Sequence, residues 1–188
     1  MSSLIVLGIV AVLFIYTVSL YNHLVTIKHA VAKAWANIDV LLKQRHDELP
    51  KLVEVCKQYK QFEQQTLQQV IEARSQVQDA RQQQDIGALG QAEGKLRRGL
   101  SSIFAVAEAY PELKSNEHFM QLQSRISTLE NGIADRRELY NEAVNINNVQ
   151  IEVFPGSIIA RLFNFGEKPL LEFSVTEKAD VDMKQLFS

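Results

Sequence analysis

The chain begins with a long apolar run, and after it the apolar positions recur every three or four residues. From Leu4 to Leu20 almost every residue is apolar, and the first 27 residues contain no Asp, Glu, Lys or Arg. As a helix this run is about 26 Å long, and continuing to Leu24 or Val25 covers the ~30 Å hydrocarbon core of a bilayer. Its twelve Leu, Ile, Val and Phe residues favour insertion by about 4 to 7 kcal/mol. The pattern predicts a transmembrane anchor over residues 1–25 that contacts lipid through residues 4–25.

The flanks of this run predict how it sits in the membrane. The run has neither a basic segment before it nor a small-residue cleavage site. We therefore interpret it as an anchor that crosses the membrane once and not as a cleaved signal peptide. Lys28, Lys33, Lys43 and Arg45 follow the run, whereas residues 1–3 carry no Lys or Arg. The positive-inside rule therefore places the body in the cytoplasm, with the periplasm as the alternative.

The three-four spacing after the anchor predicts an all-α fold, an antiparallel up-and-down bundle of about four helices over residues 26–153. Pro50 either kinks the first helix or starts a new one capped by Asp47. Ser115 and Asn116 are candidate caps for a long later helix. The first seam runs through Val31, Trp35, Ile38, Leu42, Arg45, Leu49 and Leu52, and four glycines, at positions 87, 90, 94 and 99, are expected to loosen the chain before a third helix.

Residues 154–188 differ in character from the bundle. Phe154-Pro155-Gly156 ends the long helix, and an apolar stretch containing Phe163 and Phe165 follows, which predicts a short helix and an extended piece. So apolar a segment must be covered, either by its own bundle or by a neighbouring molecule. Beyond Phe173 we expect a loosely ordered end, in which Met183, Leu186 and Phe187 are candidate docking residues.

Composition and motifs argue against several classes of function. With a net charge of −2 there is no polybasic surface, so nucleic acid is not an expected partner. The single cysteine, Cys56, cannot form an intramolecular disulfide, and we interpret it as a buried core residue. The sequence has no P-loop, GxSxG, HExxH or dinucleotide-binding turn. We therefore predict no catalytic residues, no cofactor and no metal.

Polar residues on the helical seam are interpreted as structural. His46 and Asp47 are sequence neighbours, about 100° apart on a helix, so they cannot bind one metal together. The carboxylates near the seam are expected to pair with Arg45, Arg74, Arg136 or Arg137, because buried ion pairs set helix register. These carboxylates are Asp39, Asp47, Glu108, Glu130 and Asp135. The candidate structural or assembly residues are Trp35, Asn37, Asp39, Arg45, His46, Pro50, Glu108, Tyr110, Arg136, Tyr140, Phe154, Phe163 and Phe165.

Six stretches carry a family resemblance, in order, over about residues 20–173. They are YNHLV (21–25), AWANIDVLLKQRHDELPKLVE (34–54), EARS (72–75), FAVAEAYPELKSNEHFMQLQ (104–123), YNEAVNINN (140–148) and FPGSIIARLFNF (154–165). Together they resemble the LemA family of bacterial membrane proteins. One departure is that Ile146-Asn147 stands where the family has Tyr-Asn, which loses a ring and no catalytic group.

The resemblance implies a membrane span followed by an up-and-down helical bundle, in the bacterial cytoplasmic (inner) membrane, with no established catalytic residues. Relatives include proteins of magnetosome-forming bacteria that help to build that membrane compartment. Genes of the family also often lie near those of membrane zinc peptidases. The resemblance therefore implies more about fold and location than about mechanism.

Three functional hypotheses follow. The first is a non-enzymatic, membrane-anchored scaffold that self-assembles into homo-oligomers and organises or shapes the bacterial envelope. The second is an adaptor or regulatory subunit for a membrane enzyme such as a zinc peptidase. The third, a metal-dependent hydrolase built on Asp39, His46 and Glu108, has no supporting nucleophile-base pair or ligand spacing.

Overall fold

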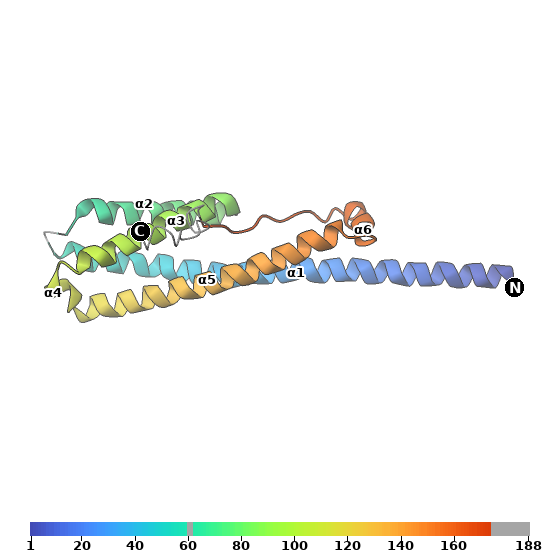
Figure 1. The fold of residues 1–188 in the computed structure, drawn as a ribbon, viewed down its shortest axis with the longest axis horizontal. Helices are drawn as coiled ribbons and strands as arrows, with labels where there is room; N and C mark the ends of the chain where they lie inside the picture. Colours follow the sequence, from blue (N-terminus) through green and yellow to red (C-terminus); the bar gives the residue numbers. More distant parts are fainter. Residues whose placement is uncertain (60–61, 174–188) are drawn as a thin grey trace, which may run out of the picture. The chain divides into compact units, whose positions relative to one another are not determined.

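The computed structural model describes residues 1–59 and 62–173. The predicted docking residues Met183, Leu186 and Phe187, and the end expected to be loosely ordered, lie outside the described residues. Over the described residues the secondary structure is helical and contains no strand, which confirms the predicted all-α class. The helices are α1 (Ser2–Lys57), α2 (Gln64–Gln83), α3 (Ile86–Ala107), α4 (Pro111–Lys114), α5 (Glu117–Glu152) and α6 (Gly156–Leu162) (Figure 1).

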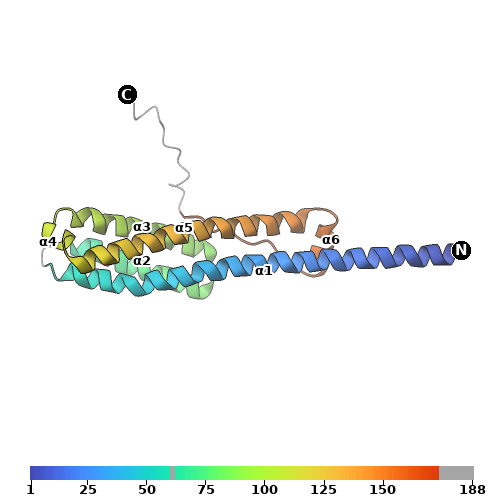
Figure 2. The same cartoon turned by 90° about the horizontal axis from the view of Figure 1, so that it is seen from below.

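The chain divides into two compact units, and the divisions fall inside α1 and α5. Unit 1 comprises Met1–Val40 and Ile133–Leu170, and unit 2 comprises Leu41–Gly132 with the chain from Leu171 onward. Unit 2 is the helical bundle, with helices from four stretches of the chain side by side (Figures 1 and 2). Unit 1 contains the apolar part of α1.

The bundle of unit 2 forms because each helix presents an apolar face at three-four spacing. On α2 the buried residues include Leu67, Val70, Ala73 and Val77, while glutamines occupy much of the exposed surface. Cys56 is fully buried, which confirms its predicted core position, and burial raises the pKa of its thiol to about 12. The fully buried core of this unit includes Leu42, Leu49, Leu52, Val70, Leu89, Leu96, Ile103, Leu113, Phe119 and Ile126.

Polar caps begin two of the bundle helices. The Asp85 carboxylate accepts a hydrogen bond from the backbone N–H of Ala88 at the start of α3 (2.9 Å). The Asn116 side chain accepts one from the N–H of Phe119 at the start of α5 (3.1 Å), which confirms Asn116 as a cap. Ser115 instead ends α4.

The expectation that glycines loosen the chain before the third helix is wrong. Gly87, Gly90, Gly94 and Gly99 all lie inside α3. Two of them serve packing: a Cβ on Gly99 would lie 2.8 Å from Val70 Cγ2 on α2, and one on Gly90 would lie 2.0 Å from the carbonyl oxygen of Glu172. Glycine is present there because a neighbouring segment approaches the helix closely.

In unit 1, α6 folds against α1. Leu24 of α1 forms a buried cluster with Ile159 and Ala160 of α6. The ring of Tyr21 contacts the rings of Phe163 and Phe165, with centroids 4.7 and 5.9 Å away. These contacts hold the C-terminal end of α6 on α1.

An extended segment, residues 164–170, follows α6 and is bound to α5 by side chains. Asn148 accepts a hydrogen bond from the N–H of Lys168 and donates one to its carbonyl, both 2.9 Å. Asn147 donates a hydrogen bond to the carbonyl of Gly166 (3.2 Å), and the Tyr140 hydroxyl donates one to the carbonyl of Pro169 (3.1 Å). Burial raises the pKa of Tyr140, so its phenol stays protonated as the donor requires.

The same segment continues into unit 2, where Leu171 and Phe173 are buried and Glu172 passes over Gly90 of α3. The sequence left open whether the apolar C-terminal segment is covered by its own bundle or by a neighbour. As far as Phe173 it is covered within this chain only in part. Ile159, Leu171 and Phe173 are buried, whereas Phe154, Ile158, Leu162 and Phe163 are exposed.

The contact at Gly90 predicts a stability effect. In Gly90→Ala the added methyl would lie 2.0 Å from the Glu172 carbonyl oxygen, so residues 171–173 must leave α3. We expect the free energy of unfolding to fall by about 1–3 kcal/mol, measured by urea unfolding in detergent. Gly87→Ala is the matched control, because its Cβ would meet only the Asp85 side chain at 3.5 Å. Equal stability of the two variants would contradict the contact.

Candidate functional site

Arg45 is the most deeply buried charged residue among the candidates, with 1% of its surface exposed. It lies on α1 at a seam position between Leu42 and Leu49. Its guanidinium donates to Glu93 of α3 and, at 2.6 Å, to Oε1 of Glu130 of α5. Glu130 is one of the five carboxylates expected to pair with an arginine, and its partner is Arg45, whereas Glu93 was not among those five.

The two carboxylates keep the Arg45 guanidinium protonated although it is buried. Burial by itself lowers the pKa of Arg45, but the charges of Glu93 and Glu130 and their hydrogen bonds outweigh that effect and raise the pKa. Burial raises the pKa of Glu93, against the opposing effect of Arg45. A buried cation without its carboxylates would be strongly unfavourable, so the three side chains constrain one another. The cluster joins three helices at one level.

Pro50 lies inside α1, which continues through it to Lys57, so the alternative of a new helix capped by Asp47 is wrong. A proline has no N–H, so the carbonyl of His46, four residues earlier, loses its helical donor. Arg74 of α2 replaces that donor, because its Nε lies 3.0 Å from the His46 carbonyl oxygen. The helix tolerates Pro50 because a neighbouring helix supplies the missing hydrogen bond.

The same arginine also sets the state of the His46 ring. Its Nη2 lies 2.6 Å from His46 Nε2, and since a guanidinium only donates, Nε2 must be the unprotonated acceptor. Burial, and then the Arg74 charge, lower the pKa of His46. His46 is therefore a neutral hydrogen-bond acceptor between α1 and α2 at neutral pH.

A further buried carboxylate, Glu48, is not among the residues that the sequence pattern singled out. It accepts hydrogen bonds from Arg125 of α5 (3.2 Å) and from Lys51 of its own helix (3.1 Å).

Glu93 could have been found from the sequence by its position on an apolar helix face, four residues after Leu89 and three before Leu96. A charge in that register is the same pattern that singled out Arg45.

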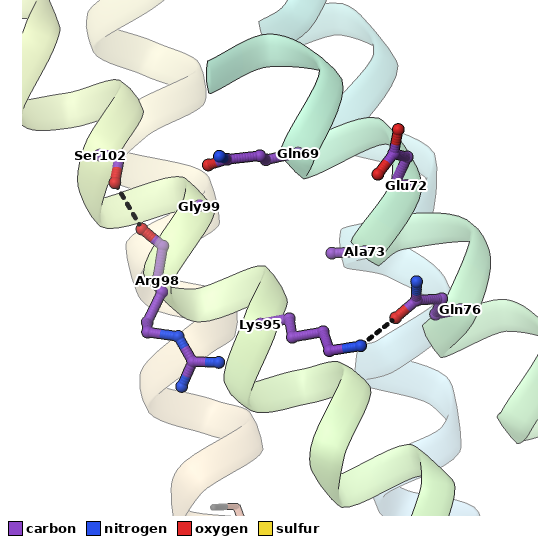
Figure 3. Close-up of a pocket in the computed structure, with 8 residues that line it drawn as sticks. All are labelled: Gln69, Glu72, Ala73, Gln76, Lys95, Arg98, Gly99 and Ser102. Carbon is purple, nitrogen blue, oxygen red and sulfur yellow. Dashed lines mark hydrogen bonds between the residues drawn. The ribbon is translucent and has the colours of Figure 1, made fainter. Parts of the chain in front are cut away.

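An open groove of about 400 Å³ lies between α2 and α3, and Figure 3 draws its lining. Lys95 crosses it and donates to the Gln76 side chain at 3.0 Å, while Ser102 donates to the backbone of its own helix at Arg98. The lining side chains are amides and charged groups over a floor of small residues, and they include no His or Cys. The hydroxyl of the lining, Ser102, is hydrogen-bonded to its own helix, and Lys95 is hydrogen-bonded to Gln76, so these two groups do not form a nucleophile-base pair. Its lining residues are Gln69, Glu72, Ala73, Gln76, Lys95, Arg98, Gly99 and Ser102.

The remaining candidates in unit 1 lie on both faces of its helices. Trp35 contacts the ring of Tyr140, with centroids 5.8 Å apart. Asn37 and Arg136 are exposed, and Asp39 is half-buried. Phe154 is exposed at the end of α5, and Phe163 and Phe165 contact Tyr21 as described above.

In unit 2, Glu108 and Tyr110 follow the end of α3. Glu108 pairs with Lys114 on the surface, and Tyr110 lies against the Phe62 ring at 5.7 Å. Neither His46, bound to Arg74, nor Glu108, bound to a lysine, has a second metal-ligating neighbour among these contacts. Within residues 1–59 and 62–173, three or more His, Cys, Asp or Glu side chains do not gather as a metal site.

Comparison with known proteins gives a consistent result. The LemA family matches residues 34–184. Protein LemA of Metamycoplasma hominis is 26% identical over 178 residues, which cover 92% of this chain and 78% of that protein. The magnetosome proteins MamQ 1 and MamQ 2 of Paramagnetospirillum magneticum are each 29% identical over 106 residues, 55% of this chain. The match spans only 39% of the length of these MamQ proteins.

The fold and its apolar first helix define a membrane-associated, all-helical protein. No residue of the most apolar stretch of α1 is buried within the chain, as a membrane span requires. This protein belongs to the LemA family. The names of these three relatives are not those of enzymes.

The Arg45 cluster predicts a contrast between two variants. Arg45→Met leaves two carboxylates without their cation, so we expect a loss of about 3–5 kcal/mol in unfolding free energy. It should remain helical by circular dichroism but change oligomer size in light scattering, because the register of three helices is released. Arg45→Met combined with Glu93→Leu and Glu130→Gln removes every charge and should regain most of the stability. A triple variant no more stable than the single one would refute this account.

The link between Pro50 and Arg74 predicts an energetic coupling. Arg74→Met should lower the free energy of unfolding by about 1–2 kcal/mol, because the His46 carbonyl loses its donor. In a Pro50→Ala background the loss should be about 1 kcal/mol smaller, since the backbone N–H gained at position 50 restores the helical bond. Urea unfolding of the four proteins measures this cycle, and Arg98→Met, at an exposed arginine of α3, is the control. Strict additivity would contradict the replacement of the donor.

Proposed function

We propose that this protein is a membrane-anchored scaffold without enzymatic activity that self-assembles into homo-oligomers and so organises or shapes the bacterial envelope. The observation that carries the proposal is a second apolar stripe, formed by Leu139, Ile146 and Val149 of α5 and by Val153 directly after its last residue. These side chains are 45–50% exposed. A single surface leucine needs no explanation, but an ordered stripe on a long helix favours association.

The spacing of this stripe is that of a helix-helix interface. Steps of seven, three and four residues separate its members, which is the heptad pattern of a coiled-coil seam. The face of α5 that is buried within unit 1 carries Ile133, Tyr140, Val144 and Asn147. At 3.6 residues per turn the two faces lie on nearly opposite sides of the helix. One face of α5 is thus used inside the chain, and the other is available to a second copy.

Anchoring strengthens such an interface. With residues 4–25 of α1 in the bacterial inner membrane and the body in the cytoplasm, every copy has the same orientation in one plane. Confinement raises the effective concentration of the stripes, so a modest helix-helix affinity suffices. Lys28, Lys33 and Lys43 after the span support this orientation. Membership of a membrane-associated family, and relatives named as magnetosome proteins, support a role at a membrane.

The proposal is tested with charges on the stripe. Wild-type protein in mild detergent should form particles several times larger than one 21.3 kDa chain. Ile146→Glu combined with Val149→Glu should weaken association at least tenfold, corresponding to about 1.4 kcal/mol, because like charges face each other in the seam. Light scattering over a range of concentrations measures the particle mass.

Met120→Glu is the matched control, because Met120 is an equally exposed apolar residue of α5 outside the stripe. It should leave the particle mass unchanged. A wild-type protein that is monomeric at all concentrations would overturn self-assembly. Recovery of a stoichiometric membrane protein bound through the stripe would favour an adaptor role instead.

A further inference from the structure

The turn from α5 into α6 exposes four large apolar side chains, Phe154, Ile158, Leu162 and Phe163. They are 51–76% exposed, among the largest exposures outside the membrane run. Ile158 and Leu162 are four residues apart and so share one face of α6. We call these four side chains the corner surface. The opposite face of α6 is buried against α1, so α6 is apolar on both sides.

The position of α6 along α1 indicates where the corner surface lies relative to the membrane. The buried face of α6 contacts Leu20, Tyr21 and Leu24 of α1. Towards the N-terminus every residue from 1 to 19 is exposed, so α6 lies where the covered part of α1 begins (Figures 1 and 2). A span that starts at Leu4 needs about 20 residues to cross the hydrocarbon core, and therefore ends near Leu24. The corner surface consequently lies at the level of the membrane boundary.

We propose that the corner surface inserts into the interfacial layer of the same bilayer that α1 crosses, which gives unit 1 a second membrane contact. This inference rests on the anchoring role of residues 4–25 in the proposed function. Exposed Phe, Ile and Leu side chains are those that enter the boundary between headgroups and acyl chains. The contact fixes the rotation of α1 about its own axis, which a single span leaves free.

The polar residues of α6 fit the same environment. Arg161 and Ser157 line a hollow together with Ile158 and Leu162. A cation and a hydroxyl beside apolar side chains match a lipid phosphate above its acyl chains. Residues 153–163 contain no Asp or Glu that would oppose an anionic headgroup.

A lipid surface explains this patch better than a second copy of the chain. The corner surface comes from a turn and one short helix, and it lacks the heptad spacing of the α5 stripe. A second copy would have to present a matching apolar surface at the headgroup level, whereas every anchored copy already meets lipid there. The bilayer is therefore the occupant that we assign.

The test places a polarity-sensitive fluorophore at single cysteines in full-length protein with a Cys56→Ala background. Ile158→Cys and Leu162→Cys report on the corner surface. Val10→Cys reports on the span, and Val40→Cys is an exposed apolar control on α1, about 24 Å beyond Leu24. Circular dichroism verifies folding of each variant, and nanodiscs of phosphatidylethanolamine and phosphatidylglycerol carry one copy each.

Lipids brominated on their acyl chains should quench labels at positions 158, 162 and 10, and aqueous iodide should quench only the label at position 40. Labels at 158 and 162 that behave like the one at 40, while position 10 is quenched by lipid, would overturn the inference and leave the anchor intact. Shielding that appears only with two copies per disc would overturn it in favour of self-association. A label at position 10 that lipid does not quench would overturn the anchor and the inference together. Because each disc holds one copy, failure of self-assembly leaves the result unchanged.

Discussion

The arrangement of the bundle depends on one buried cation. Arg45 has almost no exposed surface, and its charge is balanced by Glu93 and Glu130 from two other helices. Moving any of the three helices by one residue would separate these charges in a medium that solvates them poorly. Apolar side chains tolerate small shifts between helices, whereas this cluster does not. The cluster therefore contributes to the uniqueness of the packing more than to its total free energy.

The described surface outside this core carries the apolar faces on which the proposed self-assembly rests. α5 is apolar on two nearly opposite faces, and one of them is used within unit 1 by the buried Tyr140 and Asn147. The groove between α2 and α3 carries amide and charged side chains without a nucleophile-base pair. Chemistry on a substrate requires converging reactive groups, whereas assembly requires only ordered surface. The exposed apolar stripe of α5 is an ordered surface of the kind that the proposed assembly needs.

Helical periodicity predicted the class of fold, the Asn116 cap and the unusual position of Arg45, because each is a local departure from a regular pattern. The partner Glu93 has the same signature on α3, but a register position does not reveal which charges meet across a bundle. The prediction for the glycines of α3 was wrong, because Gly90 and Gly99 are required by residues distant in the sequence that pack closely against the helix. The binding of the extended segment by asparagine side chains likewise joins residues about 20 positions apart, beyond any local pattern.

The bond between Arg74 and the His46 carbonyl gives α1 a mechanical property that its own backbone lacks. At Pro50 an isolated helix would have one unsatisfied carbonyl and a natural point of flexion. In the folded bundle Arg74 of α2 supplies the missing hydrogen bond, so α1 is stabilised at this point by a tertiary contact. Without the Arg74 bond, the carbonyl of His46 would lack a donor and α1 could bend at this point. The regular path of α1 through Pro50 therefore depends on a contact from another helix of the bundle.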